Sequence, residues 1–315
     1  MTKIYVLDRF HPAGVAMARA FADTVVNYDD PAVKDWPEQA DGVMVRMTPV
    51  TGEQIRRAKA AGKLKIICKQ GVGYDTIDIA TAKEAGIPVS RTPGVNSEAV
   101  AELTLGLSLA VNRRIAELDR MLRNPAAQDR GNFLGGELGG KTIGIIGMGN
   151  IGTLVARKFH RAFDCKIIAY DPYVPATHWA EQPHARAATL IELLPQVDLL
   201  TVHCPLNKET RDIINAAELA QMKQGATIIN CARGGIVNEN ALYESIKRGH
   251  IFGAGLDVFD VEPPPHDHPL LSLATVVATP HSGGGTRETQ ERSATRVAQQ
   301  VIDVLQGKPA VNRVA

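Results

Sequence analysis

The chain has 315 residues, enough for about two domains that each bury a hydrophobic core. Hydrophobic residues make up 44% of it and charged residues 22%, and the formal net charge is +1. This is the balance of an ordinary globular protein. It lacks the concentrated positive charge that nucleic acid binding requires, so we expect no nucleic acid partner. No run of about 18 apolar residues occurs, so we expect no membrane span.

The cysteines favour a reduced, intracellular protein. None of the four forms a CxxC pair or has a histidine at zinc-binding spacing, and we expect no metal site. Two histidines, His266 and His268, stand close together, but their proline-rich surroundings favour an exposed loop. No secretory signal precedes the first strand-like run, so we expect a cytoplasmic protein. The cysteines are Cys68, Cys165, Cys204 and Cys231.

Short apolar runs alternate with amphipathic stretches in the first hundred residues. This alternation is typical of βαβ units, in which helices flank a parallel sheet. Strands are predicted at 3–8, 42–47, 64–68 and 87–91, with helices at 15–21, 51–61 and 77–85 between them.

The stretch from Asn96 to about Leu122 is rich in apolar residues and predicts one long helix. A helix of roughly 25 residues is about 37 Å long, enough to bridge two domains. The glycine-rich segment 131–140 predicts a connector after it.

A second series of strands and helices follows and predicts a doubly wound domain with its own sheet. The last stretch, 287–306, predicts a helix that ends before Gly307 and Pro309. The six predicted strands lie at 142–147, 166–170, 197–203, 226–231, 252–258 and 275–280.

The segment Gly147-Met148-Gly149-Asn150-Ile151-Gly152 has the pattern GxGxxG between a predicted strand and a predicted helix. In that context the pattern predicts a dinucleotide site. The first glycine makes a tight turn, the second lets a pyrophosphate approach the backbone, and the third allows close packing of helix on strand. The start of the helix offers free amides and a positive dipole end to the phosphates.

Asp171 ends the next predicted strand, 19 residues beyond Gly152. A carboxylate at this place accepts hydrogen bonds from the ribose hydroxyls and repels a 2′-phosphate. The following residues, Pro172 and Tyr173, supply no arginine to neutralise such a phosphate. We therefore expect NAD rather than NADP as the cofactor.

Polar residues follow three later strands, in segments 230–235, 257–263 and 279–284. Open α/β sheets bind ligands at the carboxyl ends of their strands, so an arginine, a glutamate and a histidine from these segments can converge. A histidine suits the transfer of a hydroxyl proton near neutral pH. A carboxylate on its other nitrogen fixes the tautomer, and an arginine binds a substrate carboxylate in bidentate fashion.

At these motifs the chain resembles the D-isomer-specific 2-hydroxyacid dehydrogenases, which are NAD-dependent oxidoreductases that act on the CH–OH group of 2-hydroxy acids. The likeness runs from about Lys3 to Asn312. It rests on GELGGKTIGIIGMGNIG, VHCPL, INCARGGIVNENAL, AGLDVFDVEP and ATPHSGG, which occur in the family's order and spacing.

The resemblance implies a catalytic set in which Arg233 binds the substrate carboxylate, Glu262 orients the histidine and His281 is the acid/base. It implies a Rossmann cofactor domain at 98–286. A flavodoxin-like substrate domain is implied at 1–97 and 287–315.

The resemblance also implies residues that line the cofactor and the substrate. For Asp257 the sequence leaves a purely structural role equally open. The cofactor-lining positions are His203, Cys204, Pro205, Cys231, Ala232 and Asp257. The substrate-binding positions are the loop Gly71, Val72 and Gly73, together with Asn96 near the domain boundary.

Within the family the chain looks most like short D-3-phosphoglycerate dehydrogenases, in the runs VRMTPVT (45–51), NFLGGELGGKT and NCARGGIVNENAL. Arg46 in segment 45–51 either binds a substrate phosphate or forms a structural salt bridge. Hydroxypyruvate or glyoxylate reductases and other small 2-hydroxyacid dehydrogenases remain alternatives. An NAD(H)-sensing binding protein is a more distant one. Family members that resemble the chain are homodimers, so we expect a dimer through the cofactor domains.

Overall fold

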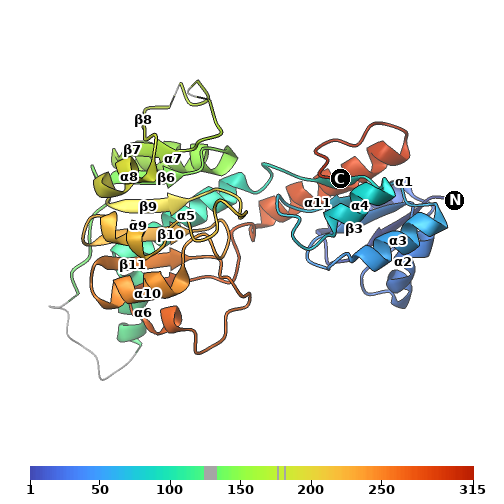
Figure 1. Cartoon of the computed structure of the whole chain (residues 1–315). Helices are drawn as coiled ribbons and strands as arrows, with labels where there is room; N and C mark the ends of the chain where they lie inside the picture. The colour runs from blue at the N-terminus through green and yellow to red at the C-terminus, as the bar shows by residue number, and fades with distance from the viewer. Residues whose placement is uncertain (124–132, 176, 181) are drawn as a thin grey trace. The chain divides into compact units, whose positions relative to one another are not determined.

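The computed structural model describes residues 1–123, 133–175, 177–180 and 182–315. The chain divides into two compact units (Figure 1). Unit 1 comprises Met1–Asn96 and Gly285–Ala315, and unit 2 comprises Ser97–Gly284.

Unit 1 is built on a sheet of five parallel strands in the order β2-β1-β3-β4-β5. The chain starts in the interior of the sheet and winds outward on both sides of β1, which is the flavodoxin-like order. β2 was not predicted, because three residues at a sheet edge are too short to show alternation. The strands are β1 (Lys3–Val6), β2 (Thr24–Val26), β3 (Gly42–Val45), β4 (Ile66–Lys69) and β5 (Val89–Arg91).

Helices cover both faces of this sheet. Successive strand residues point to opposite faces, so each face carries apolar side chains that a helix must bury. Ile4 belongs to a buried cluster with Val297 of α11, and the next residue, Tyr5, belongs to another with Ile55 of α3. One face carries α1 (Pro12–Phe21) and α11 (Arg287–Leu305). The other carries α2 (Trp36–Gln39), α3 (Gly52–Ala61) and α4 (Ile79–Ala85), with the short helix η1 (Pro31–Asp35) before α2.

Unit 2 is built on seven parallel strands in the order β12-β11-β10-β9-β6-β7-β8. The chain enters at β6, builds outward through β7 and β8, and then returns to β9 on the other side of β6. This is the Rossmann order with one added strand, and it confirms two doubly wound parallel-sheet domains. The strands are β6 (Thr142–Ile146), β7 (Lys166–Tyr170), β8 (Ala185–Arg186), β9 (Leu199–Val202), β10 (Ala226–Asn230), β11 (Ile251–Leu256) and β12 (Val276–Ala278).

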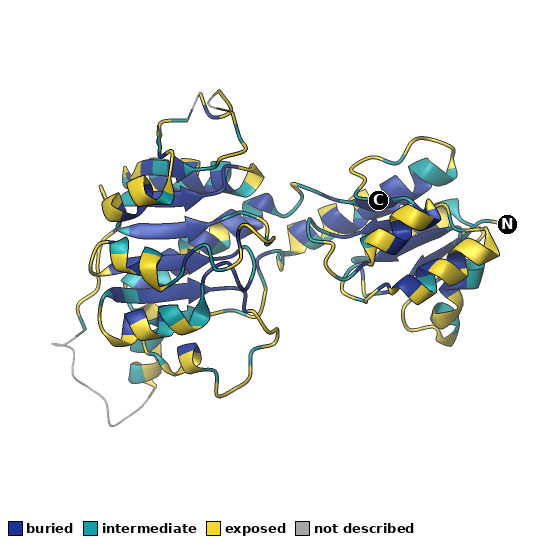
Figure 2. Cartoon of the chain, in the orientation of Figure 1, coloured by how far each residue is buried: buried dark blue, intermediate teal, exposed yellow. Residues whose placement is uncertain are grey.

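Two buried clusters hold the helices of unit 2 against its sheet, whose strands are dark blue in Figure 2. Phe159 of α7 packs with Ile145 and Ile167 on one face, and Leu242 of α10 packs with Ile228 on the other. The first face carries α5 (Ser97–Asn112) and α7 (Asn150–Phe163). The second carries α8 (Leu190–Leu193), η2 (Leu194–Gln196), α9 (Ala216–Gln221), α10 (Glu239–Lys247) and η3 (Pro269–Ser272).

The prediction of one helix from Asn96 to Leu122 is wrong. The chain forms α5 and then a separate helix, α6 (Ile115–Leu122), because Arg114 has a left-handed backbone with φ of 54°. The Asn112 carbonyl accepts a hydrogen bond from the Gly136 amide (2.8 Å), a distant contact that no helical period reveals. The predicted connector begins outside the described residues. None of the described helices has the length and apolar composition needed to cross a bilayer.

Candidate active site

The carboxyl ends of the central strands of unit 2 lie level with one another. Ile146 pairs with both Tyr170 and Val202, and Asn230 pairs with both Val202 and Leu256. The residues that follow these strand ends therefore share one edge of the sheet. They are Gly147, Asp171, His203, Cys231 and Asp257.

The glycine turn after β6 leaves no room for side chains at two of its positions. Gly147 has φ of +95°, and a Cβ there would lie 2.7 Å from the carbonyl carbon of His203. A Cβ on Gly152 would lie 2.1 Å from the Gly147 carbonyl oxygen. At Gly149, by contrast, no atom of the described residues beyond the glycine and its two chain neighbours lies within 4 Å of a Cβ. The first and third glycines thus shape the turn, and the second leaves open space above the backbone.

This open space lies at the start of α7. Gly149 is the N-cap of the helix and has no side chain to bind the amides of the first turn. Those amides and the positive end of the helix dipole suit a phosphate group. The arrangement fits the dinucleotide that the sequence predicts, with Asn150 and Ile151 in the first turn.

Asp171 is tied to the glycine turn as well as to its own loop. Its carboxylate accepts hydrogen bonds from the amides of Met148 (2.8 Å), Tyr173 (2.9 Å) and Val174 (3.2 Å). The Met148 carbonyl in turn accepts one from the Trp179 indole (3.0 Å). Met148 is fully buried and both of its backbone groups are used internally, so it holds the turn to the Asp171 loop.

Arg186 in β8 also holds this loop in place, and the sequence analysis did not predict this residue as part of the site. Its guanidinium donates hydrogen bonds to the carbonyls of Asp171 (3.2 Å), Val174 (2.7 Å) and Pro175 (2.8 Å). Trp179 was also missed. Neither belongs to a motif, and only the fold brings them to the turn.

The segment after β9 contributes neutral side chains to the edge. The Thr201 hydroxyl and His203 Nε2 are 3.0 Å apart, and burial lowers the pKa of His203 to about 3. Burial raises the pKa of the Cys204 thiol to about 11 and that of the Cys231 thiol to about 12. The Pro205 carbonyl accepts a hydrogen bond from the hydroxyl of a threonine further along the same loop. This part of the edge is therefore uncharged near neutral pH.

Arg233 sits on a tight turn after β10. The Asn230 side chain holds both ends of the turn, donating to the Arg233 carbonyl (2.9 Å) and accepting from the Ala232 amide (3.0 Å). The half-buried guanidinium donates to the Ala232 carbonyl (2.6 Å). A Cβ on Gly234 would lie 2.0 Å from the carbonyl oxygen of Phe259. The arginine turn thus lies directly against the loop that carries Glu262.

Glu262 and His281 form the one carboxylate–histidine pair expected from the sequence. His281 Nδ1 lies 2.7 Å from Glu262 Oε2, and the two side chains are 42% and 35% exposed. The other carboxylate oxygen accepts from the Phe259 amide (3.1 Å), which fixes its orientation. His281 has a left-handed backbone with φ of 51°. The pair holds Nδ1 and leaves Nε2 as the ring nitrogen for proton transfer.

Asp257 organises the histidine loop. It is 1% exposed, and its carboxylate accepts from the Thr279 hydroxyl (2.6 Å) and the amides of Ser282 (2.7 Å) and Gly283 (2.8 Å). Its carbonyl accepts from the His281 amide (2.8 Å). These bonds give it a structural task in the loop that carries the histidine.

In unit 1, the loop 71–73 follows β4. Gly71 has φ of +96°, and its amide donates to the Thr92 hydroxyl (2.8 Å). No hydrogen bond between described residues uses the amides of Val72 or Gly73. Asn96 Oδ1 is buried and, within the described part of the chain, has no hydrogen-bond partner. Two free amides in a glycine loop suit an anion.

Arg46 also lies at a strand end of unit 1, after β3, and its backbone is held from two sides. The Asp8 carboxylate accepts from the amides of Arg46 (2.5 Å) and Thr48 (3.0 Å). Lys69, only 5% exposed, donates its ammonium group to the Arg46 carbonyl. The structure therefore fixes the backbone from which the half-buried Arg46 side chain leaves.

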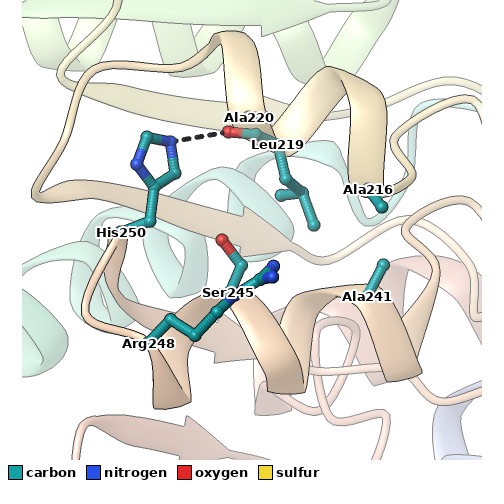
Figure 3. Close-up of a pocket in the computed structure, with 7 residues that line it drawn as sticks. All are labelled: Ala216, Leu219, Ala220, Ala241, Ser245, Arg248 and His250. Atoms are coloured by element: carbon teal, nitrogen blue, oxygen red, sulfur yellow. Dashed lines mark hydrogen bonds between the residues drawn. The ribbon is translucent and has the colours of Figure 1, made fainter.

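A separate pocket of about 290 Å³ lies between α9 and α10 (Figure 3). At one end His250 Nε2 lies 3.0 Å from the Leu219 carbonyl oxygen. It shares no residue with the edge described above. The described residues also include no group of three His, Cys, Asp or Glu side chains placed to hold one metal ion. The pocket is lined by Ala216, Leu219, Ala220, Ala241, Ser245, Arg248 and His250.

Comparison with known proteins agrees with this geometry. Residues 105–283 match the model of the family described as D-isomer specific 2-hydroxyacid dehydrogenase, NAD binding domain. The chain belongs to this dehydrogenase family. The match confirms the family resemblance, and the matched residues all lie within unit 2.

Individual relatives of the chain differ in name and length. It is 41% identical to the D-3-phosphoglycerate dehydrogenase of Methanocaldococcus jannaschii, over 99% of this chain but only 59% of that protein. It is 43% identical to the hydroxypyruvate reductase of Thermotoga maritima, over 88% of each. The crystal structure of TT0316 protein from Thermus thermophilus matches over 100% of both chains, with a TM-score of 0.88 and 36% identity.

Proposed function

We propose that this dehydrogenase uses NAD to oxidise a small D-2-hydroxy acid, or NADH to reduce the matching 2-keto acid. The observation that carries the proposal is the contact of 2.7 Å between His281 Nδ1 and Glu262 Oε2, beside the Arg233 turn and on the same sheet edge as the glycine turn. A histidine held in this way by a carboxylate is the recurring arrangement of a general acid/base.

The proposed chemistry divides between the cofactor and three side chains. When bound, NAD supplies the acceptor for the hydride that leaves the alcohol carbon of the substrate. His281 Nε2 takes the hydroxyl proton as the C=O bond forms, and returns it in the reverse reaction. Glu262 holds Nδ1–H and so keeps Nε2 free to accept this proton. Arg233 binds the substrate carboxylate and polarises the neighbouring oxygen.

We propose NAD rather than NADP because of Asp171. Its carboxylate lies at the end of β7, where it can accept hydrogen bonds from the hydroxyls of a ribose. Its negative charge there repels a 2′-phosphate. The phosphates belong at the start of α7. The proposed cofactor-binding residues are Gly147, Met148, Gly149, Asn150, Ile151, Gly152, Asp171, His203, Cys204, Pro205, Cys231 and Ala232. Asp257 is left out of this set, because its carboxylate already accepts hydrogen bonds from the loop at 279–283.

For the substrate we propose D-3-phosphoglycerate first. Arg46 offers a cation for a second anionic group, on a backbone that Asp8 and Lys69 hold in place. We assign the substrate carboxylate to the free amides of Val72 and Gly73 in the 71–73 loop, and substrate contact to Asn96. Hydroxypyruvate and glyoxylate are the second candidates, because the hydroxypyruvate reductase of Thermotoga maritima, at 43% identity, matches over 88% of its own length and of this chain.

The test is a panel of keto acids with NADH, followed by the loss of NADH absorbance. The panel contains phosphohydroxypyruvate, hydroxypyruvate, glyoxylate and pyruvate, and Arg46→Gln is assayed beside the unmodified chain. If Arg46 binds phosphate, the variant loses activity on phosphohydroxypyruvate and keeps it on hydroxypyruvate. NADH binding without turnover of any keto acid contradicts the proposal and favours an NAD(H)-sensing protein.

We also propose a cytoplasmic homodimer in which unit 2 binds NAD and unit 1 binds substrate. Two apolar side chains of α6, next to α5, are exposed to solvent: Ile115 (53%) and Leu122 (81%). Exposed apolar side chains support a contact there between the unit 2 domains of two protomers. Light scattering at micromolar concentration measures the mass. A monomer contradicts the dimer, and Leu122→Glu is expected to shift the mass toward it.

A further inference from the structure

The Arg186 guanidinium donates its hydrogen bonds to a single loop. It stands at the end of β8, a strand of two residues that pairs with β7 at the edge of the sheet. Its guanidinium reaches the loop that leaves β7 and binds three carbonyls in it, those of Asp171, Val174 and Pro175, at 2.7 to 3.2 Å. The planar guanidinium has five N–H donors in a rigid fork and can hold several acceptors at once.

The other side of this loop faces the glycine turn. The Asp171 carboxylate accepts the Met148 amide at 2.8 Å and two amides of its own loop. The carbonyls of the loop thus point toward Arg186, and its carboxylate points toward the turn. A continuous set of hydrogen bonds runs from Arg186 through residues 171–175 to Met148 in the glycine turn.

We propose that Arg186 is a positioning residue for the cofactor: it sets the Asp171 carboxylate at the angle that receives the adenosine ribose. The inference rests on the proposed use of NAD and assigns a residue of that same site. Arg186 acts through Asp171 and makes no contact with the dinucleotide itself. A lysine replaces it only in part, because a single ammonium group on a flexible stem does not match the three carbonyls that the guanidinium binds.

The experiment measures NADH binding to the full chain by fluorescence titration. Arg186→Met keeps much of the side-chain length and removes every donor, and Arg186→Lys keeps the charge. We expect the dissociation constant to rise roughly tenfold in the first variant and less in the second, on the scale of lost hydrogen bonds to a charged group. Arg161→Met, an exposed arginine in the last turn of α7, is the matched control and is expected to bind NADH normally.

A double-mutant cycle separates positioning through Asp171 from a general structural effect. In an Asp171→Ala background, Arg186→Met is expected to change the dissociation constant by less than about twofold, because the group through which it acts is gone. A loss of equal size in both backgrounds overturns the proposal, as does normal NADH binding by Arg186→Met in the unmodified background.

NADPH titration gives a further decisive outcome. If Arg186→Met weakens NADPH binding more than NADH binding, Arg186 is a phosphate ligand and the proposal is wrong. Failure of the proposed function looks different, because the unmodified chain then turns over no keto acid, whereas failure of the present proposal shows in the NADH dissociation constants of the Arg186 variants. Circular dichroism of each variant shows that the fold is retained, and Arg186→Lys keeps the test valid should Arg186→Met not fold.

Discussion

Replacement of Asp257 tests whether this buried carboxylate holds the histidine loop or binds the cofactor. The side chain is 1% exposed and accepts four hydrogen bonds from the loop at 279–283, two from amides and two from hydroxyls. Asp257→Ala leaves these donors without their acceptor. We therefore expect the loop to lose its fixed position and His281 to leave its place beside Glu262.

The size of the effect follows from the contacts. A hydrogen bond to a charged group contributes roughly 1.5–3 kcal/mol. The two hydroxyls can turn to other partners, so the two amides dominate, and we expect Asp257→Ala to cost about 3–5 kcal/mol of unfolding free energy. Displacement of the acid/base by about 1 Å lowers turnover by about 100-fold. Asp257→Asn keeps the shape and is expected to lie between the unmodified chain and the alanine variant.

The assay combines urea unfolding, NADH titration and turnover, with Asp267→Ala as a control. Asp267 is an exposed aspartate in the same connection between β11 and β12, and its loss should change stability by less than about 0.5 kcal/mol. The expected pattern for Asp257→Ala is lower stability and turnover with NADH affinity nearly unchanged. Normal stability together with lost NADH affinity would refute the structural reasoning and show direct contact with the cofactor.

The remaining predictions concern the acid/base, cofactor choice, acid stability and thiol reactivity. His281→Ala should lower turnover by roughly 10²–10⁴-fold while NADH still binds, and near-normal turnover rejects the mechanism. The unmodified chain should prefer NAD over NADP by at least about tenfold in kcat/KM, with the gap narrowed in Asp171→Ala, and equal use of both cofactors contradicts the role of the carboxylate. Burial lowers the pKa of His203 to about 3 in the folded chain. In the unfolded chain the histidine binds a proton at its ordinary pKa of about 6.5, so protonation favours the unfolded chain. Stability should therefore fall as the pH drops from that value toward 3, and less steeply in His203→Gln, as measured by urea unfolding at several pH values. Since burial raises the pKa of Cys231 to about 12, iodoacetamide should alkylate it slowly in the folded chain and readily in urea, as mass mapping will show.

Local sequence pattern by itself determined much about this protein. The alternation of apolar runs and amphipathic stretches identified the α/β class, because each face of a parallel sheet needs a helix to cover it. The spacing from Gly147 to Asp171 identified the nucleotide turn, because the roles of its glycines follow from backbone geometry. Arg233, Glu262 and His281 were predicted because each lies in a segment that follows a strand, and parallel strands end at one edge. Their roles came from the resemblance to the dehydrogenase family.

Other features depended on contacts between residues far apart in the chain. Arg186 and Trp179 reach the Asp171 loop and Met148 only once β8 lies beside β7. The helix breaks at Arg114, where the Gly136 amide donates a hydrogen bond to the nearby Asn112 carbonyl. The periodicity of the helix itself does not predict this contact.

The contacts of Asp257 show most clearly what only the tertiary structure reveals. Its motif was equally compatible with contact to a cofactor and with a structural role, since a carboxylate after a strand suits both. The fold places it 1% exposed beneath the loop at 279–283, where amides and hydroxyls surround it. A buried carboxylate requires such donors, and the chain supplies them from more than twenty residues away, where sequence proximity gives no sign of them.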